Sequence, residues 1–533
     1  MSSKPGINYF TNKTVKEVAF LVAIFAFSLA VRAIGIKHGF PLLTHPDEGF
    51  SFQPVLHMTT YRTLNTGYFN RPDQIMSMVN LVYLNVLSYL KFGENVAQAF
   101  PKHYLSFYAY ARFLIAILGS FIPVVAYKIG KEFKPVFGIY AALVFAAFPS
   151  YVLHSLFITP DIPITLFTLI VMYFSVRYLK EGKNKFLYFA ILFAAINTAE
   201  KFPGLISLSI VLGAVLINSL RQDKRPLTAQ LWPVTKKFLL VFLLFIVALL
   251  IVAPFLFIEY RAVIDALVFE SRSSHLGADN LGWLGNLWFY VAAFSSWVNM
   301  LAFVFIGFGL YAMIKWRKAS SLLLLYGVLY WIILSALSLH WERWALPMYI
   351  TPLFLIALGI TQAITMTKNK PILRISAAAL VVIFLFVQAI GTLHVPVRLL
   401  FTDTRFASLT YLEGEHITPD QSIYEGYTPF YPHGPKLIFD QDVLDNEDIH
   451  YIILSSRMYE RYYAEPARYA DEINVYEQIR NDHQLIKRFE QSPPADQLLE
   501  KIDDLRYFVQ NFGPRPIPGR FTGPTIEIYR VVR

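Results

Sequence analysis

The chain has 533 residues, of which 55% are hydrophobic and 16% charged, and its mean hydropathy is +0.45. Soluble domains carry about 25% charged residues, so this composition excludes an ordinary soluble fold and predicts repeated membrane-spanning segments of roughly 20 apolar residues. The net charge of +10 does not indicate a nucleic-acid partner, because basic residues of membrane proteins gather in cytoplasmic loops, and the lack of cysteine excludes disulfides and thiol chemistry.

The apolar stretches, taken in chain order, predict a polytopic α-helical membrane protein with about eleven spanning helices. The first, residues 18–36, is expected to be an uncleaved helix because it is long for a signal peptide and lacks a good cleavage site. The others lie at residues 107–127, 136–153, 157–176, 186–199, 203–219, 238–258, 290–313, 319–338, 344–364 and 375–393. Stretch 186–199 is short for a bilayer core of about 30 Å, so with 203–219 it forms either two spans or a re-entrant pair.

Basic residues alternate between the loops, which predicts the topology. With the N-terminus inside, the loops outside the cytoplasm carry few basic residues: Lys201, Arg261, Arg272 and Arg343. The cytoplasmic loops carry many: Lys128, Lys131, Lys134, Arg177, Lys180, Lys183, Lys185, Arg221, Lys224, Arg225, Lys236, Lys237, Lys315, Arg317, Lys318, Lys368, Lys370 and Arg374. This asymmetry follows the positive-inside rule and predicts a multi-pass protein of the cytoplasmic (inner or plasma) membrane, with its C-terminal domain outside.

Two large regions are expected outside the membrane. The first is the loop 37–104, whose amphipathic stretches 50–60 and 74–90 predict helices lying in the membrane interface. The second is residues 398–533, which follow a membrane module formed by residues 1–397. Short β-rich runs at 436–439, 450–454 and 525–529 alternate there with helical patterns such as 475–490, which predicts a small α/β domain.

Acidic and basic residues at the outer helix ends are the candidate site. Asp47 and Glu48 follow the first helix, and Asp161 lies in a short loop on the same predicted side. Alone, an adjacent acid pair is better explained as a solvated turn, and Asp after Pro is a common turn former. Each cation alone could equally be an interfacial residue. Together, these cations suit an anionic, phosphate-bearing substrate: Arg112, Lys201, Arg272, His340 and Arg343.

The order of these motifs resembles a known family. The motifs are His45-Pro-Asp-Glu48, Asn70-Arg-Pro72, Tyr110-Ala-Arg112, Pro160-Asp-Ile-Pro163, Glu200-Lys-Phe-Pro-Gly204, Glu342-Arg-Trp-Ala-Leu-Pro347 and Asp403-Thr-Arg-Phe-Ala407. The set resembles the lipid-carrier-dependent GT-C glycosyltransferases, in the branch with protein O-mannosyltransferases and aminoarabinose transferases of lipid A. The likeness covers most of the chain.

The resemblance implies an inverting transfer of a sugar from a polyprenyl-phosphate donor to an acceptor outside the cytoplasm, whether protein, lipid or polysaccharide. Asp47 matches the family's essential first-loop acid, expected to act as general base or orienter. Glu48 and Asp161 are expected to bind sugar hydroxyls, orient the acceptor or hold a divalent cation, although no dedicated metal-site spacing is present. Donor phosphate binding is assigned to Lys201, Arg343 and Arg112 and, from the predicted topology alone, to Arg272 and His340. Trp344 departs from the family's usual Arg-Tyr pair.

Two other classes of protein remain as alternatives. A transporter or lipid flippase predicts charges near the bilayer midplane, broken helices and repeat symmetry, whereas the acids here sit at helix ends and no repeat is visible. A membrane scaffold that binds partners through its outer domain leaves the ordered motifs unexplained. The expected partners are therefore a polyprenyl-phosphate sugar, an extracytoplasmic acceptor and the lipid bilayer.

Overall fold

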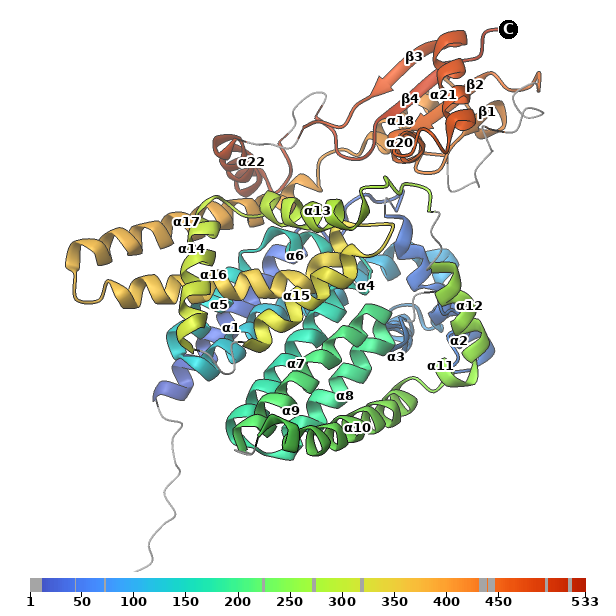
Figure 1. The fold of residues 1–533 in the computed structure, drawn as a ribbon. Helices are drawn as coiled ribbons and strands as arrows, with labels where there is room; N and C mark the ends of the chain where they lie inside the picture. Colours follow the sequence, from blue (N-terminus) through green and yellow to red (C-terminus); the bar gives the residue numbers. More distant parts are fainter. Residues whose placement is uncertain are drawn as a thin grey trace, which may run out of the picture.

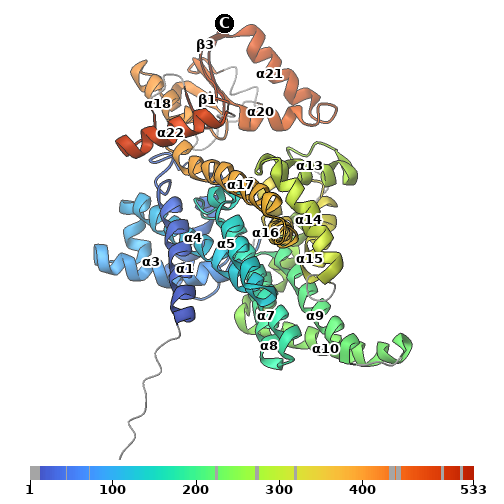
Figure 2. The same cartoon turned by 90° about the vertical axis from the view of Figure 1, so that its left-hand side faces the viewer.

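A computed structural model describes residues 12–43, 45–70, 73–222, 226–270, 275–316, 321–430, 439, 446–493, 497–515 and 520–533 of the chain. Packed helices occupy most of it, and a small sheet with its own helices lies at one end (Figures 1 and 2). The beginning of α1 (Asn12–Ala33) lies at the opposite end from that sheet (Figure 2). The predicted fold class, a polytopic helical protein with a C-terminal α/β part, is confirmed.

The helical part contains, after α1, the elements η1 (Pro46–Ser51), α2 (Gln53–Tyr61), α3 (Gln74–Phe92), α4 (Val96–Phe133), α5 (Pro135–Ala146), α6 (Pro149–His154), α7 (Asp161–Glu181), α8 (Asn184–Glu200), η2 (Phe202–Ser207) and α9 (Leu208–Gln222). It continues with α10 (Leu227–Val252), α11 (Phe255–Ile258), α12 (Tyr260–Glu270), α13 (Gly282–Ser296), α14 (Leu301–Trp316), α15 (Ser321–Ser335), η3 (Glu342–Ala345), α16 (Leu346–Met366) and α17 (Pro371–Arg398).

Local sequence signals explain several of these boundaries. Gly93 ends α3 at φ +73, a conformation that suits glycine. Asn95 then starts α4 with a capping box, accepting the Gln98 N–H while the Gln98 side chain accepts the Asn95 N–H. Helix α4 therefore begins before the apolar stretch predicted at 107–127, and it bends at His103 (φ −133).

The eleven predicted spans all fall on helices, but their number is not confirmed. Among the described helices, eight are long and apolar enough to cross a membrane, or up to nine if the bent pair α13 and α14 counts as one. That pair turns by 115° inside the stretch 290–313, and stretch 136–153 is divided between α5 and α6. Phe148 is extended there because it precedes Pro149. Helix α3 also meets the length and composition criterion, although an interfacial helix was predicted.

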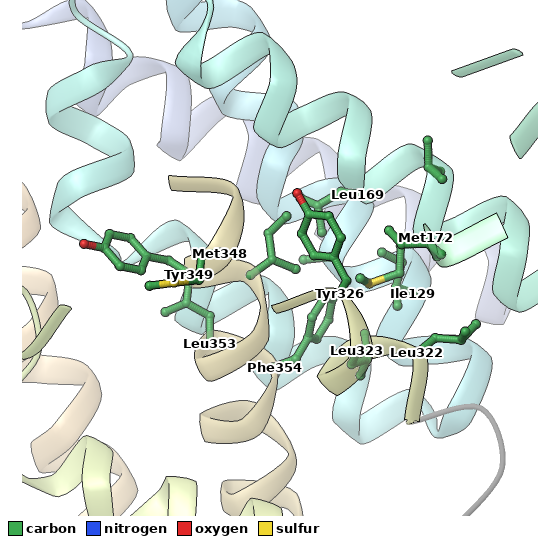
Figure 3. Packing of buried hydrophobic residues seen from close by; sticks show 14 of the residues in the cluster. Ile129, Leu169, Met172, Leu322, Leu323, Tyr326, Met348, Tyr349, Leu353 and Phe354 are labelled. Atoms are coloured by element: carbon green, nitrogen blue, oxygen red, sulfur yellow. The ribbon is translucent and has the colours of Figure 1, made fainter. Parts of the chain in front are cut away.

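The core lies between α4, α5, α7, α8, α15 and α16, and α16 is its most enclosed helix. Figure 3 shows side chains of α7, α15 and α16 interlocking there, including Leu169, Tyr326 and Phe354. Helices α14 and α16 approach closely through glycine. A Cβ added at Gly359 would lie 1.8 Å from the carbonyl oxygen of Phe305. This contact therefore requires a residue without a side chain, as is common between membrane helices.

The C-terminal α/β region (residues 404–530) is built on a four-stranded sheet of order β1-β2-β4-β3. Its elements are α18 (Thr404–Gly414), η4 (Pro419–Gln421), β1 (Ser422–Tyr424), β2 (Tyr451–Ser455), α20 (Ser456–Tyr463), α21 (Ala470–Asp482), β3 (Gln484–Phe489), α22 (Leu498–Asn511) and β4 (Ile526–Arg530). Strand β1 runs parallel to β2, whereas β2 and β3 pair antiparallel with β4. The side chains of β2 and β4 are buried almost throughout, because helices cover the sheet.

The predictions for this region are partly confirmed. The runs 450–454 and 525–529 form β2 and β4, in register Ile453↔Ile528. The helix predicted at 475–490 is wrong in its second half, where the chain turns at His483 and continues as β3. Of the run 436–439, residues 436–438 lie outside the described residues, and Phe439 is in a turn.

A buried hydrogen bond fastens the C-terminal α/β region to the helical part. Asp504 of α22 is fully buried and contacts the ring of His394 on α17 at 2.9 Å. The same carboxylate forms an ion pair with the Arg520 guanidinium at 3.0 Å and accepts a hydrogen bond of 3.1 Å from it. The contact places the sheet over the ends of α13 and α17 (Figure 1), so the sheet can form part of a site at that end.

The stability of the sheet is expected to depend on pH because the carboxyl group of Glu425, which follows β1, is buried. Its carboxylate accepts the Ser455 N–H at 2.7 Å and the Tyr476 hydroxyl. Burial raises the pKa of Glu425 from its ordinary value of 4.5 to about 7. The protonated form is therefore favoured in the folded protein, and the resulting stabilisation is present below pH 4.5 and lost as the pH rises through about 7. The loss amounts to roughly 3 kcal/mol.

Hydrogen exchange of the β2 and β4 amides at about pH 5 and about pH 8, corrected for intrinsic rates, measures this effect. Glu425→Gln is expected to remove most of the difference in protection. Glu413→Gln, which changes an exposed acid of the same region, serves as the control. Equal pH dependence in wild type and Glu425→Gln would assign the effect to other groups.

Candidate active site

The first loop positions Asp47 at the start of a short helix. His45 precedes η1, and its ring Nδ1 accepts the Asp47 N–H at 3.3 Å. Burial, together with the nearby charge of Arg343, lowers the pKa of His45 to about 3. The ring is therefore neutral at neutral pH, and because Nδ1 is an acceptor its hydrogen is on Nε2. His45 thus orients the backbone that carries Asp47.

Glu48 and Arg112 form a buried ion pair beneath this loop. Both side chains are 0% exposed, and two hydrogen bonds of 2.7 Å join them. Glu48 also accepts the Ile158 N–H at 3.1 Å, and Arg112 donates to the carbonyl oxygens of Ile36 and His38 at 2.8 Å. Both residues were predicted to contact the substrate. In this structure all their charged atoms are directed to protein partners, and the pair ties the loop to α4 and to the α6–α7 connection.

Arg112→Gln is expected to destabilise the protein strongly, because it leaves the Glu48 carboxylate buried without its counter-charge. Removing one partner of a buried pair costs about 3–5 kcal/mol. Arg177→Gln is a matched control, since Arg177 pairs with Glu181 near the surface, where a pair is worth about 1 kcal/mol or less. Thermal unfolding in detergent measures both, and equal losses would contradict the structural role. The double variant Glu48→Gln/Arg112→Gln is expected to recover part of the stability.

Two further acid–cation pairs lie at helix ends around the loop. The Asp47 carboxylate pairs with Arg343 of η3, and the two side chains are 19% and 24% exposed. Asp161, the first residue of α7, accepts a hydrogen bond of 2.7 Å from the Lys201 ammonium group. Lys201 follows α8, and its ammonium lies 5.8 Å from the centre of the Trp344 ring. Four segments distant in sequence thus bring together four predicted site residues.

Two histidines complete what we call the charged cluster: Asp47, Asp161, Lys201, Arg343, His45 and His154. The charges of Asp47, Arg343 and Asp161 all act on His45, so the two pairs share one electrostatic environment. His45 packs on Phe157 at 4.5 Å between ring centres, and His154 lies 6.3 Å from the same ring. The cluster therefore combines a partly exposed carboxylate (Asp47), a buried carboxylate (Asp161), cations with spare donors and neutral imidazole.

A cavity of about 570 Å³ opens beside Asp47 and Arg343. This volume is in the usual range for small-ligand sites. One wall comes from the helical part and the opposite wall from the C-terminal α/β region. Its lining residues are His38, Gly39, His45, Pro46, Asp47, Phe157, His275, Leu276, Leu339, Trp341, Arg343, Leu399, Asp403, Arg405, Tyr427, Arg457, Arg461, Thr522, Gly523 and Pro524.

The geometry does not fit a divalent cation held by the three predicted acids. Asp47, Glu48 and Asp161 each pair with a different cationic side chain. Within the described ranges, no group of three or more His, Asp or Glu residues is arranged to hold a metal ion. The chemistry derived below therefore uses only the side chains of the charged cluster.

The remaining predicted residues lie elsewhere. His340 contacts Asp279 at 3.2 Å and packs on Phe289, outside the cavity lining, and its binding of the donor phosphate stays a prediction. Its neighbours Leu339 and Trp341 do line the cavity. The backbone is extended at Trp341, so successive side chains alternate in direction. Arg272, like Arg71 and Pro72 of the first loop, lies outside the described residues.

Several cavity residues were not identified from the sequence. Arg457, Arg461 and Tyr427 come from the C-terminal α/β region, more than 80 residues beyond Arg343 in the chain. The spacing of the two arginines, i and i+4, would place them on one face of a helix. No sequence signal indicates that this face looks toward Asp47.

Comparisons with known proteins bear on the family and the fold of this chain. Residues 108–258 match the family model described as dolichyl-phosphate-mannose-protein mannosyltransferase. The fold matches ArnT from Cupriavidus metallidurans bound to undecaprenyl phosphate, at 14% identity and a TM-score of 0.50, covering 86% of this chain and 95% of ArnT. The apo structure of the same ArnT matches at 14% identity and 0.51, covering 90% and 96%. No curated protein matches this chain.

The matched segment 108–258 contains Asp161 and Lys201, whereas Asp47 and Arg343 lie on either side of it. The structural matches extend over most of the chain and show a shared fold. Together they confirm the resemblance that the ordered motifs predicted.

Proposed function

Given the mannosyltransferase family match and the ArnT fold, we propose that this chain is a lipid-carrier-dependent GT-C glycosyltransferase that takes a sugar from a polyprenyl-phosphate donor. The observation that supports this most is the charged cluster beside the cavity. It joins a partly exposed carboxylate, Asp47, to cations that suit a phosphate. Its partners are the donor lipid, an acceptor and the bilayer.

The proposed reaction is an inverting displacement at the anomeric carbon of the sugar. A hydroxyl or amine of the acceptor attacks that carbon while the bond between the carbon and the phosphate oxygen breaks. Asp47 accepts the proton from the nucleophile. Polyprenyl phosphate leaves with the bonding electron pair, and Lys201 and Arg343 stabilise the negative charge that it gains. No acid has to protonate this leaving group, because a phosphate is already a stable anion.

The two cations can bind phosphate without releasing their carboxylates. Lys201 has three N–H donors and directs one to Asp161, and Arg343, which forms an ion pair with Asp47, has five N–H donors. The pairs with Asp161 and Asp47 hold the ammonium and guanidinium in place, so little side-chain freedom is lost when a phosphate binds.

The proposed topology puts this reaction outside the cytoplasm. The basic loops favour an inside N-terminus, and the start of α1 lies at the opposite end from the C-terminal α/β region (Figure 2). We therefore propose a membrane module of residues 1–397 and an extracytoplasmic domain of residues 398–533. A reporter fused after Arg398 is expected to be exported, and a cytoplasmic reporter would contradict this orientation.

Donor turnover tests the proposed function. Purified protein in liposomes would be incubated with polyprenyl phosphates that carry different hexoses and pentoses, with release of free polyprenyl phosphate as the readout. At least one donor is expected to be consumed, and the same panel identifies the sugar. If the folded protein neither binds nor consumes any member of the panel, the proposal is wrong.

A further inference from the structure

The C-terminal α/β region contributes its own charges to the cavity. Arg457 and Arg461 both line it from α20, and Arg405 lines it from α18. The two α20 residues are one helical turn apart and therefore lie on the same face. Like charges at this spacing repel each other, and an anion bound in the cavity would relieve that repulsion.

The lining of the cavity has more cations than acids. It includes four arginines but only two aspartates, Asp47 and Asp403. Both aspartates have a partner: Asp47 forms an ion pair with Arg343, and Asp403 accepts two hydrogen bonds of 2.8 Å from Arg405. In the part of the chain that the structure describes, neither Arg457 nor Arg461 has an acidic side chain within ion-pair distance. The excess charge therefore lies on α20.

Arg461 is held in place by aromatic groups. Its guanidinium donates to the Tyr427 hydroxyl at 2.9 Å and lies 5.3 Å from the centre of that ring. It also lies 5.7 Å from the centre of the Trp341 ring, which belongs to the helical part. Tyr427 adopts φ +63, a conformation unusual for tyrosine. Two aromatic residues from different parts of the fold thus orient one uncompensated guanidinium.

Contacts inside the C-terminal α/β region help to hold this wall in place. Thr522 forms a parallel bridge with Asp403, the residue that caps the start of α18, and Gly523 packs on the Asp403 side chain. A Cβ at Gly523 would lie 2.6 Å from the Asp403 Oδ1 atom, and its φ of +92 also suits glycine. The Thr522–Asp403 bridge and the buried Asp504 contact to α17 hold the C-terminal α/β region in place. Arg457 and Arg461 therefore line the same cavity as Asp47 and Arg343.

We propose that Arg457 and Arg461 bind a phosphate group carried by the acceptor. The inference rests on the proposed function, which assigns the donor phosphate to Lys201 and Arg343. In an inverting displacement the acceptor and the leaving phosphate lie on opposite faces of the anomeric carbon. The donor phosphate stays with its lipid on the membrane side, so the wall formed by the C-terminal α/β region faces the acceptor. Arginine pairs suit phosphate because they donate several N–H groups in a fixed plane.

Equilibrium dialysis with labelled glucose 1-phosphate tests this site. The protein would be saturated with undecaprenyl phosphate, which occupies the donor site, and neutral glucose would serve as the uncharged comparison. Wild type is expected to bind glucose 1-phosphate but not glucose. Arg457→Gln and Arg461→Gln are each expected to weaken binding about tenfold or more, because each removes charge-assisted hydrogen bonds. Arg468→Gln, a half-exposed arginine beside Glu465 in the same region, should have no effect.

Binding of undecaprenyl phosphate itself is measured in parallel for every variant. It is expected to be unchanged in Arg457→Gln and Arg461→Gln. If these variants lose undecaprenyl phosphate rather than glucose 1-phosphate, the α20 arginines belong to the donor and the inference is wrong. Equal binding of glucose 1-phosphate by wild type and both variants would also overturn it. If wild type binds glucose 1-phosphate but no undecaprenyl phosphate, the proposed function fails while the anion site stands.

Discussion

Asp47→Asn is expected to lower the rate of sugar transfer by a factor of about 10²–10⁴, the usual contribution of a general base. The amide keeps the size of the side chain but cannot accept the proton of the nucleophile. Donor affinity should change much less, because Lys201 and the Trp344 ring beside it are untouched. The effect should therefore appear in kcat, measured as product formed per enzyme with saturating donor.

A matched control separates this role from a general effect of removing an acid. Asp279→Asn changes a carboxylate in the loop before α13 that contacts His340 away from the cavity. It is expected to retain nearly full transfer activity. A folded Asp47→Asn variant that transfers sugar at the wild-type rate would exclude Asp47 from the chemistry.

Lys201→Met is expected to reduce turnover of the donor by a factor of about 10²–10³, because it removes a preorganised cation from the leaving phosphate. It also leaves the Asp161 carboxylate, which is 1% exposed, without its partner, so the variant should be less stable as well. The double variant Asp161→Asn/Lys201→Met removes that buried charge and should regain stability. Turnover and thermal unfolding, measured on the same preparations, distinguish the two effects.

Activity is expected to stay low in the double variant even where stability returns. If turnover returns with stability, Lys201 is needed for the stability of the fold and not for binding the phosphate. Lys180→Met is the control, since Lys180 makes a comparable 2.8 Å pair with Glu132 at the other end of the helices. Its loss should leave turnover unchanged.

Much of the charged cluster could be predicted because charged residues are few in an apolar chain. Asp47, Asp161, Lys201 and Arg343 stand at helix ends that the loop charges place on one side, and the structure brings all four together. Glu48 looked equivalent to Asp47 from its position. Its partner Arg112 is 64 residues away, and only the packing of the loop on α4 shows that the two neutralise each other.

The C-terminal wall of the cavity could not be predicted for a similar reason. Its residues are in place because α22 packs on α17 and because Thr522, just before β4, pairs with Asp403. The division of the chain into helices was clear from hydropathy, but the 115° turn between α13 and α14 was not, since both helices are uniformly apolar. Strand β3 was missed because pairing with β4, rather than local pattern, determines its conformation.

The most direct test of the central claim is a cryo-electron microscopy structure of the protein with undecaprenyl phosphate bound. We predict that the phosphate lies within hydrogen-bond distance of Lys201 or Arg343, beside the Asp47 carboxylate. A phosphate bound elsewhere, with Lys201 and Arg343 still contacting only Asp161 and Asp47, would contradict the account.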